Sequence, residues 1–148
     1  MLDRTYDSQL CSVARTLELV GERWTMLIIR DALAGVSRFD GFLGSLGIAR
    51  NVLAARLSGL VEHGIMVRVP YQDRPVRHEY RLTPAGGDLA TTVLALMDWG
   101  DRHLAAEAGP PCTAEHADCG GRVAARLVCE ACGTRVSAEE VTLRPNPA

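Results

Sequence analysis

The sequence contains no lysine, so all sixteen of its basic residues are arginine. It also lacks an apolar run long enough to cross a bilayer, and its first residues, MLDRTYDSQL, do not have the layout of a signal peptide. These absences predict a soluble, cytoplasmic protein with no membrane partner. The lack of lysine can reflect a GC-rich genome, so the positions of the arginines are more informative than their identity.

Motifs for common enzyme chemistries are missing as well. The chain has no phosphate-binding loop, no nucleophile elbow and no paired carboxylates in a histidine-bearing context. Its four histidines are scattered, at His63, His78, His103 and His116. We therefore expect a binding protein and not an enzyme.

Charge is unevenly distributed along the 148 residues. The net charge of −2 argues against a nucleic-acid partner, because phosphate binding is largely electrostatic. Residues 38–81, however, carry seven arginines against four acidic residues, a local net charge of +3. Because arginine pairs well with phosphates and guanine edges, this middle block is the candidate DNA-binding region.

Apolar spacing predicts four helices before residue 64. Ser12 should cap the first, which Gly21 ends, and the second follows in ERWTMLIIRDALAG with apolar positions Trp24, Leu27, Ile28 and Ala32. RFDGFLGSLG predicts a short third helix, and IARNVLAARLSGLVEHG predicts an amphipathic fourth with the stripe Leu53, Leu57, Leu60 and Val61.

The pattern then changes to that of a β-hairpin. IMVRVPYQ and VRHEYRLT have strand-like spacing and are separated by the turn-prone QDRP. Thr83 and Pro84 should start a long helix that runs to about Ala108, where GPP ends it. We expect a DNA-binding and dimerisation domain at 1–108 and a small module at 109–148.

The order of these elements predicts a mainly α fold with a small β-hairpin wing, that is, a winged helix-turn-helix. In such a fold the fourth helix enters the major groove and the hairpin lies on the flanking backbone or minor groove. Arginine reads guanine, asparagine can read adenine, and a small apolar side chain can touch thymine methyls. The candidate DNA-binding residues are Arg38, Arg50, Asn51, Ala54, Arg56, Arg74 and Arg77.

The functional interpretation of the arginines on the predicted fourth helix has an alternative. An arginine on the outer face of a helix is often only solvated surface.

A dimer is expected because one short reading helix gives little specificity, and the helix after Pro84 offers Val93, Met97 and Trp99 as an interface. A core position for Trp99 is the competing interpretation.

Four of the five cysteines lie near the end of the chain. His116-x2-Cys119-Gly and Cys129-x2-Cys132-Gly match the paired turns that hold structural zinc, with Cys112 as a spare ligand. This tail has few large apolar residues, so zinc would replace the missing core of a small ribbon-like module. Empty reduced cysteines, or disulfides formed during handling, are the alternatives.

The fifth cysteine, Cys11, precedes the first predicted helix. The positive end of the helix dipole and nearby Arg15 would favour its thiolate, which suggests a redox sensor. A buried cysteine acting as a small apolar residue is the alternative.

Taken together, the stretch from Cys11 to Leu104 resembles the HxlR family of MarR-like winged-helix regulators. The resemblance lies in CSVARTLELVGERWTMLIIRDAL, in RFDGFLGSLGIARNVLAARLSGLVEHGIMVR and in the junction YRLTPAG, with Glu22 and Arg23 replacing the usual Gly and Lys. It implies a transcriptional regulator that is a homodimer joined through terminal helices. It also implies DNA contacts by Arg50, Asn51, Arg56, Arg74 and Arg77.

The resemblance further implies a redox or small-molecule effector, because some relatives sense oxidants through a cysteine at the place of Cys11. The rival hypothesis is a zinc-ribbon interaction protein whose winged helix contacts protein instead of DNA.

Overall fold

The structure is a computed structural model that describes residues 11–104 and 106–147. Its backbone contacts divide the chain into two compact units, Met1–Val93 and Leu94–Ala148. The expected domain boundary, after residue 108, lies within the second unit. Within the described residues, no helix is long and apolar enough to span a membrane.

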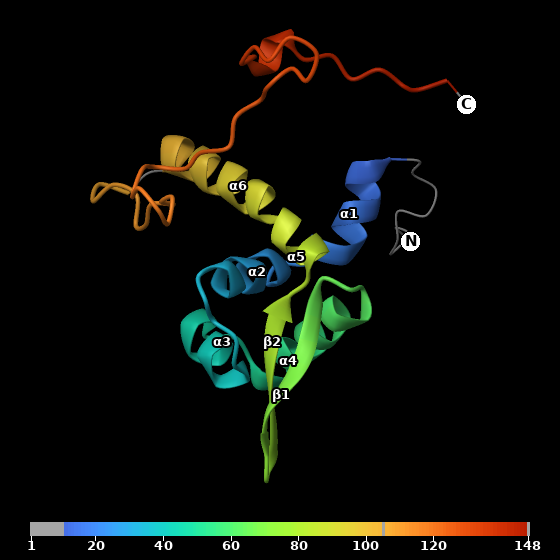
Figure 1. Cartoon of the computed structure of the whole chain (residues 1–148), viewed down its shortest axis with the longest axis vertical. Coiled ribbons are helices and arrows are strands. Elements are labelled where there is room, and N and C mark those ends of the chain that lie inside the picture. The colour runs from blue at the N-terminus through green and yellow to red at the C-terminus, as the bar shows by residue number, and fades with distance from the viewer. Residues whose placement is uncertain (1–10, 105, 148) are drawn as a thin grey trace. The chain divides into compact units, whose positions relative to one another are not determined.

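Four helices and a hairpin make up most of the first unit (Figure 1). The helices are α1 (Ser12–Val20), α2 (Thr25–Leu33), α3 (Phe39–Leu46) and α4 (Arg50–Glu62). Strands β1 (Met66–Asp73) and β2 (Val76–Leu82) pair antiparallel around the turn at Arg74 and Pro75. Figure 1 shows the hairpin extending beyond the helices as a wing, so the predicted mainly α fold with a winged helix-turn-helix is confirmed.

The core of this unit forms where α2, α3, α4 and β1 meet. Its fully buried side chains are Ile28, Ile29, Phe42, Leu53, Leu57 and Met66. The predicted stripe of α4 is confirmed at Leu53, Leu57 and Leu60, whereas Val61 is only half-buried. On α2 the predicted stripe is partly wrong, because Thr25 and Ile29 are buried while Trp24 and Leu27 are half-buried.

Two helix starts test the capping predictions. Thr83 is confirmed as a cap, since its hydroxyl accepts a hydrogen bond from the Gly86 amide at 3.1 Å. The cap predicted at Ser12 is wrong: Ser12 is the first helical residue, and Cys11 holds the cap position in extended conformation without a side-chain hydrogen bond.

The helix predicted from Pro84 to about Ala108 is two helices, α5 (Pro84–Asp88) and α6 (Ala90–His103). Leu89 separates them with nearly helical dihedral angles. The end at His103 comes earlier than expected, because the small residues after Leu104 provide no apolar face to pack. Val93, expected at the dimer interface, is instead buried.

The second unit contains most of α6 and the Cys-rich tail. The tail has two isolated antiparallel bridges, Glu115 with Arg122 and Val128 with Arg135, and a short 3-10 helix η1 (Ala138–Glu140). The Ser137 amide donates to the Glu140 carboxylate at 2.7 Å, and this hydrogen bond lowers the pKa of Glu140.

Candidate DNA-binding surface

The turn between α3 and α4 sets the position of the reading helix. Gly47 ends α3 in the left-handed conformation, with φ of +60°, and its amide donates to the Leu43 carbonyl at 3.1 Å. A residue with a side chain is disfavoured at this φ, whereas glycine adopts it freely. Ile48 is then buried, and α4 starts at Arg50 with its first turn at the surface.

The outer face of α4 is small and polar. Its exposed residues recur at helical spacing, on the side opposite the buried leucines: Arg50, Asn51, Ala54, Ala55 and Ser58. Small side chains here allow the helix to approach base edges closely, and Arg50 and Asn51 supply the donors. The structure therefore places three predicted residues, Arg50, Asn51 and Ala54, on one exposed face.

Arg56 does not lie on that face. Its guanidinium forms an ion pair at 3.3 Å with Glu22, in the connection between α1 and α2, and its side chain is 34% exposed. Its Nε is buried without a hydrogen-bond partner among the described residues. Arg56 thus ties α4 to the connection between α1 and α2.

An open groove lies beside the start of α4, between α3 and the wing. It is lined by Arg38, Phe39, Asp40, Gly41, Arg50, Tyr71, Arg77 and His78. Two of its arginines lie over aromatic rings: the Arg38 guanidinium is 4.3 Å from the centre of Tyr71, and that of Arg50 is 5.2 Å from the centre of Phe39. These contacts limit the conformations of both side chains at the surface.

The groove carries more positive than negative charge. Three of its lining residues are arginines, and its one acidic residue is Asp40, which accepts a hydrogen bond from Arg50 at 3.3 Å. Both partners of this ion pair are largely exposed, so the pair is weak and Arg50 can exchange Asp40 for another acceptor.

The wing is attached to the helical part by the segment before α3. The Tyr80 amide donates to the Ser37 carbonyl at 2.7 Å, and Arg38 forms a bridge with Glu79. Beyond this attachment, Arg74 at the turn and Arg77 on β2 are both exposed. The groove and the wing tip together present four of the predicted DNA-binding arginines, Arg38, Arg50, Arg74 and Arg77.

The remaining predicted site residues are cysteines and one histidine. Cys11 is exposed and unpaired, which contradicts the buried interpretation. In the tail, His116 Nδ1 lies 3.2 Å from Cys119 Sγ, and Cys129 and Cys132 belong to one tight turn. Hydrogen bonds with Thr134 lower the pKa of the Cys132 thiol. Among the described residues, no three potential ligands lie close enough to share one ion.

Residues 19–108, which include the reading helix and the wing, match the profile of HxlR-like helix-turn-helix proteins. The chain belongs to this family. A transcriptional regulator of the helix-turn-helix type from Mycobacterium tuberculosis, Rv3095, is 51% identical over 136 residues, covering 92% of this HxlR-like chain and 86% of the relative. The HxlR-like protein is therefore a DNA-binding transcriptional regulator.

Two solved structures are also similar to this chain. The crystal structure of PA1607, a transcription-factor candidate, is 38% identical and covers 93% of the HxlR-like chain and 96% of its own, with a TM-score of 0.82. That similarity includes the tail beyond residue 108. The redox regulator HypR in its reduced form is 30% identical, covers 64% of the HxlR-like chain and 96% of its own, and gives a TM-score of 0.59.

The sequence pattern placed Ala55 and Ser58 on the outer face of α4, and both are exposed there. It did not identify Phe39 and Tyr71, which support the arginines of the groove. Tyr71 lies at the irregular register between Pro70 and Gln72, so no regular strand pattern predicts where its ring points.

Proposed function

We propose that this HxlR-like regulator binds operator DNA as a homodimer, with α4 in the major groove and the wing on the flanking backbone. The observation that carries the proposal is the set of exposed arginines running from the start of α4 to the wing tip. The one acidic residue that lines the groove, Asp40, forms only an exposed ion pair with Arg50, so the arginines are accessible to phosphates and bases.

Each residue has a role that fits its place. Arg50, Asn51 and Ala54 contact base edges, and Arg38, Arg74 and Arg77 contact phosphates or the minor groove. Arg56 has a stabilising role, because its ion pair with Glu22 joins α4 to the connection between α1 and α2. A winged helix that contacts protein is the less favoured interpretation, because the relatives are transcriptional regulators of the helix-turn-helix type.

The homodimer is supported by apolar side chains that stay exposed on two helices. These are Val13, Leu17 and Leu19 on α1 and Leu96 and Trp99 on α6. Apolar residues repeated along one helix favour association with a partner more than scattered ones do. A dimer also gives the protein two reading helices for two half-sites, about 34 Å apart along the duplex.

Selection from a pool of random duplexes tests this proposal. The wild-type chain should enrich an inverted repeat whose half-sites are about one helical turn apart. Arg50→Ala should enrich a more degenerate motif, whereas the exposed tail variant Arg144→Ala, with the same loss of charge, should select the wild-type motif. Failure of the wild-type chain to enrich any motif would contradict the proposal.

We further infer that Cys11 makes the regulator responsive to oxidants, with a small-molecule effector as the alternative input. The thiol is exposed at the start of α1, next to an exposed apolar helix face, so its oxidation would alter that face. The resemblance to a solved redox regulator supports this inference.

The prediction for Cys11 is a loss of response. Operator affinity of the wild-type protein should change after treatment with a mild oxidant, and Cys11→Ser should keep its affinity unchanged. Cys112→Ser, which removes another exposed thiol, is the matched control and should respond like the wild type. An oxidant response that persists in Cys11→Ser would refute the role of Cys11.

A further inference from the structure

The tail contains the same backbone turn twice. The first knuckle comprises residues 114–123 and the second comprises residues 127–136, so equivalent positions differ by thirteen in the sequence. Each knuckle is closed by one antiparallel bridge, Glu115 with Arg122 in the first and Val128 with Arg135 in the second. These bridges occupy equivalent positions.

The hydrogen bonds of the two knuckles also correspond. The His116 amide donates to the Gly121 carbonyl at 2.8 Å, and the Cys129 amide donates to the Thr134 carbonyl at 2.9 Å. In both knuckles a glycine amide donates at 2.8 Å to the carbonyl four residues earlier, from Gly120 to His116 and from Gly133 to Cys129. The two turns are therefore built in the same way.

Glycine is required at the equivalent positions Gly120 and Gly133. Their φ angles are +68° and +71°, which residues with side chains rarely adopt. The left-handed residue turns the backbone directly after Cys119 and Cys132. As a result, each knuckle brings its two potential ligands to the same side of the turn.

Each knuckle holds half of a ligand set. His116 Nδ1 lies 3.2 Å from Cys119 Sγ in the first, and Cys129 and Cys132 occupy the equivalent positions of the same turn in the second. Two ligands hold an ion weakly, whereas three thiolates and one imidazole form a closed tetrahedral zinc site. The pairing of two half-sites in one chain therefore predicts a shared ion.

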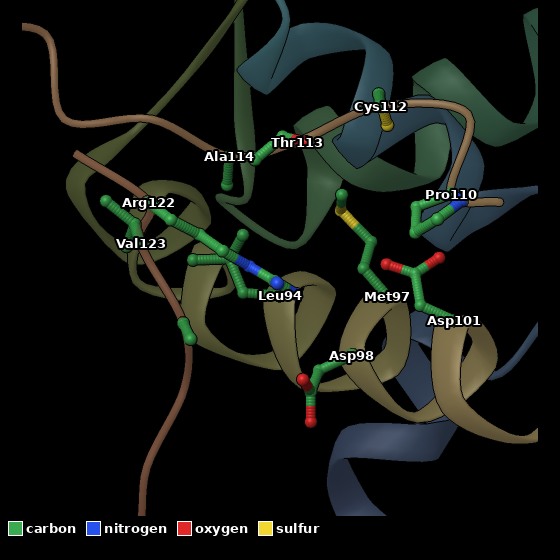
Figure 2. A pocket seen from close by; sticks show the side chains of 11 residues that line it. Leu94, Met97, Asp98, Asp101, Pro110, Cys112, Thr113, Ala114, Arg122 and Val123 are labelled. Carbon is green, nitrogen blue, oxygen red and sulfur yellow. The ribbon is translucent and has the colours of Figure 1, made fainter. Parts of the chain in front are cut away.

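Among the described residues the two ligand pairs do not form a group of three or more, so binding one ion requires the knuckles to move together, and the segment between them can permit this. No backbone–backbone hydrogen bond is found for Ala124, Ala125 or Arg126 within the described part of the chain. Figure 2 shows the pocket that the first knuckle lines with α6, including Leu94, Met97 and Asp98. Asp98 also lines a second pocket with Leu127 and Val136, the first and last residues of the second knuckle. Both knuckles therefore lie near the same residue of α6.

The tail needs a source of stability other than apolar packing. Most of its larger apolar residues are exposed, namely Val123, Leu127, Val128, Val141 and Leu143. A chain segment without a buried core loses more conformational entropy on ordering than its contacts return. Metal coordination is the usual substitute in small modules.

We propose that the two knuckles close on one structural zinc ion, bound by His116, Cys119, Cys129 and Cys132 of the same chain. Zn²⁺ displaces the protons of the three thiols, which pass to solvent, and His116 binds as neutral imidazole. Four protein ligands leave no open coordination position, so the role is structural. Cys112 has no equivalent in the second knuckle and is not a ligand.

Metal analysis of the full-length chain, purified reduced and without chelators, tests the proposal. We expect about one zinc per chain, falling below about a tenth in Cys119→Ser and Cys129→Ser. Cys112→Ser is the matched control and should retain the metal. A wild-type protein without zinc, or a Cys112→Ser variant that loses it, would overturn the assignment.

Cobalt titration of the metal-free full-length chain tests the sharing of one ion. The visible absorption of tetrahedral, thiolate-bound Co²⁺ should saturate at about one equivalent, and His116→Cys should retain it as a site of four cysteines. Saturation at two equivalents would mean that each knuckle binds its own ion. A dimer that dissociates on zinc removal would mean that two chains share the ions, and either result contradicts the proposal.

Discussion

Arg50 is the residue for which the geometry gives the sharpest expectation. It is exposed on the first turn of α4, is held over Phe39, and has an exposed ion pair with Asp40 as its only competing partner among the described carboxylates. Once it exchanges Asp40 for DNA, the guanidinium can form two hydrogen bonds to a guanine edge. Its contribution should therefore be to specificity more than to general affinity.

Arg50→Ala is expected to lower the discrimination between operator and unrelated DNA by about 1–3 kcal/mol. Competition binding at fixed salt measures this ratio, and Arg144→Ala provides the control for loss of one positive charge. If Arg50→Ala weakens both DNAs equally, Arg50 contacts phosphate and not a base.

Arg56, in contrast to Arg50, is expected to stabilise the fold and not to read DNA. Its half-buried side chain and its ion pair with Glu22 give it a structural task, although its sequence position suggests a reader. Arg56→Ala should lower the free energy of unfolding, and a double-mutant cycle with Glu22→Ala should give a coupling of about 0.5 kcal/mol. Urea titration measures both values.

The same Arg56→Ala protein should keep its operator preference once it is folded. A changed preference at a single base-pair position would show that Arg56 reaches the DNA, and our assignment would fail.

At the scale of the element, we expect the wing to contribute positive charge to DNA binding but not to distinguish between bases. Arg74 and Arg77 are exposed near a two-residue turn, where the Gln72 side-chain amide donates to the Arg74 carbonyl at 3.1 Å. We expect Arg74→Ala to weaken binding to all sequences by a similar factor and to reduce the slope of log affinity against log salt by about 0.9. Salt titration on operator and scrambled duplexes measures this slope. A sequence-dependent loss would place Arg74 on base edges.

The elements also show how far the sequence alone was informative. The leucine stripe of α4, the hairpin and the Thr83 cap follow from local periodicity and turn chemistry, and they were predicted correctly. The pairing of Arg56 with Glu22 and the stacking of Arg38 on Tyr71 depend on tertiary packing between distant segments. No local pattern contains that information, so the assignment of Arg56 to the reading face could not be checked before the fold was known.

At the scale of the whole molecule, the proposed dimer depends on apolar surface that one chain leaves uncovered. Leu96 is 56% exposed and Trp99 is 52% exposed on α6. Leu96→Ala and Trp99→Ala should each raise the dimer dissociation constant at least about tenfold, because each removes apolar contact area at an interface.

Sedimentation equilibrium measures this change. Leu143→Ala, at a position 93% exposed in the tail, removes apolar surface outside both helices and should leave the constant unchanged. A monomeric wild-type chain, or an equal effect of all three variants, would contradict an interface on α6.

The central claim is that the protein reads DNA through α4 and the wing. Its most direct test is the affinity of the wild-type chain for the promoter beside its own gene, compared with a scrambled duplex across a range of salt concentrations. We predict tighter binding to the promoter by about 10³-fold or more, with affinity for both duplexes falling steeply as salt rises. Equal affinity for the two duplexes, or binding that is insensitive to salt, would contradict the account.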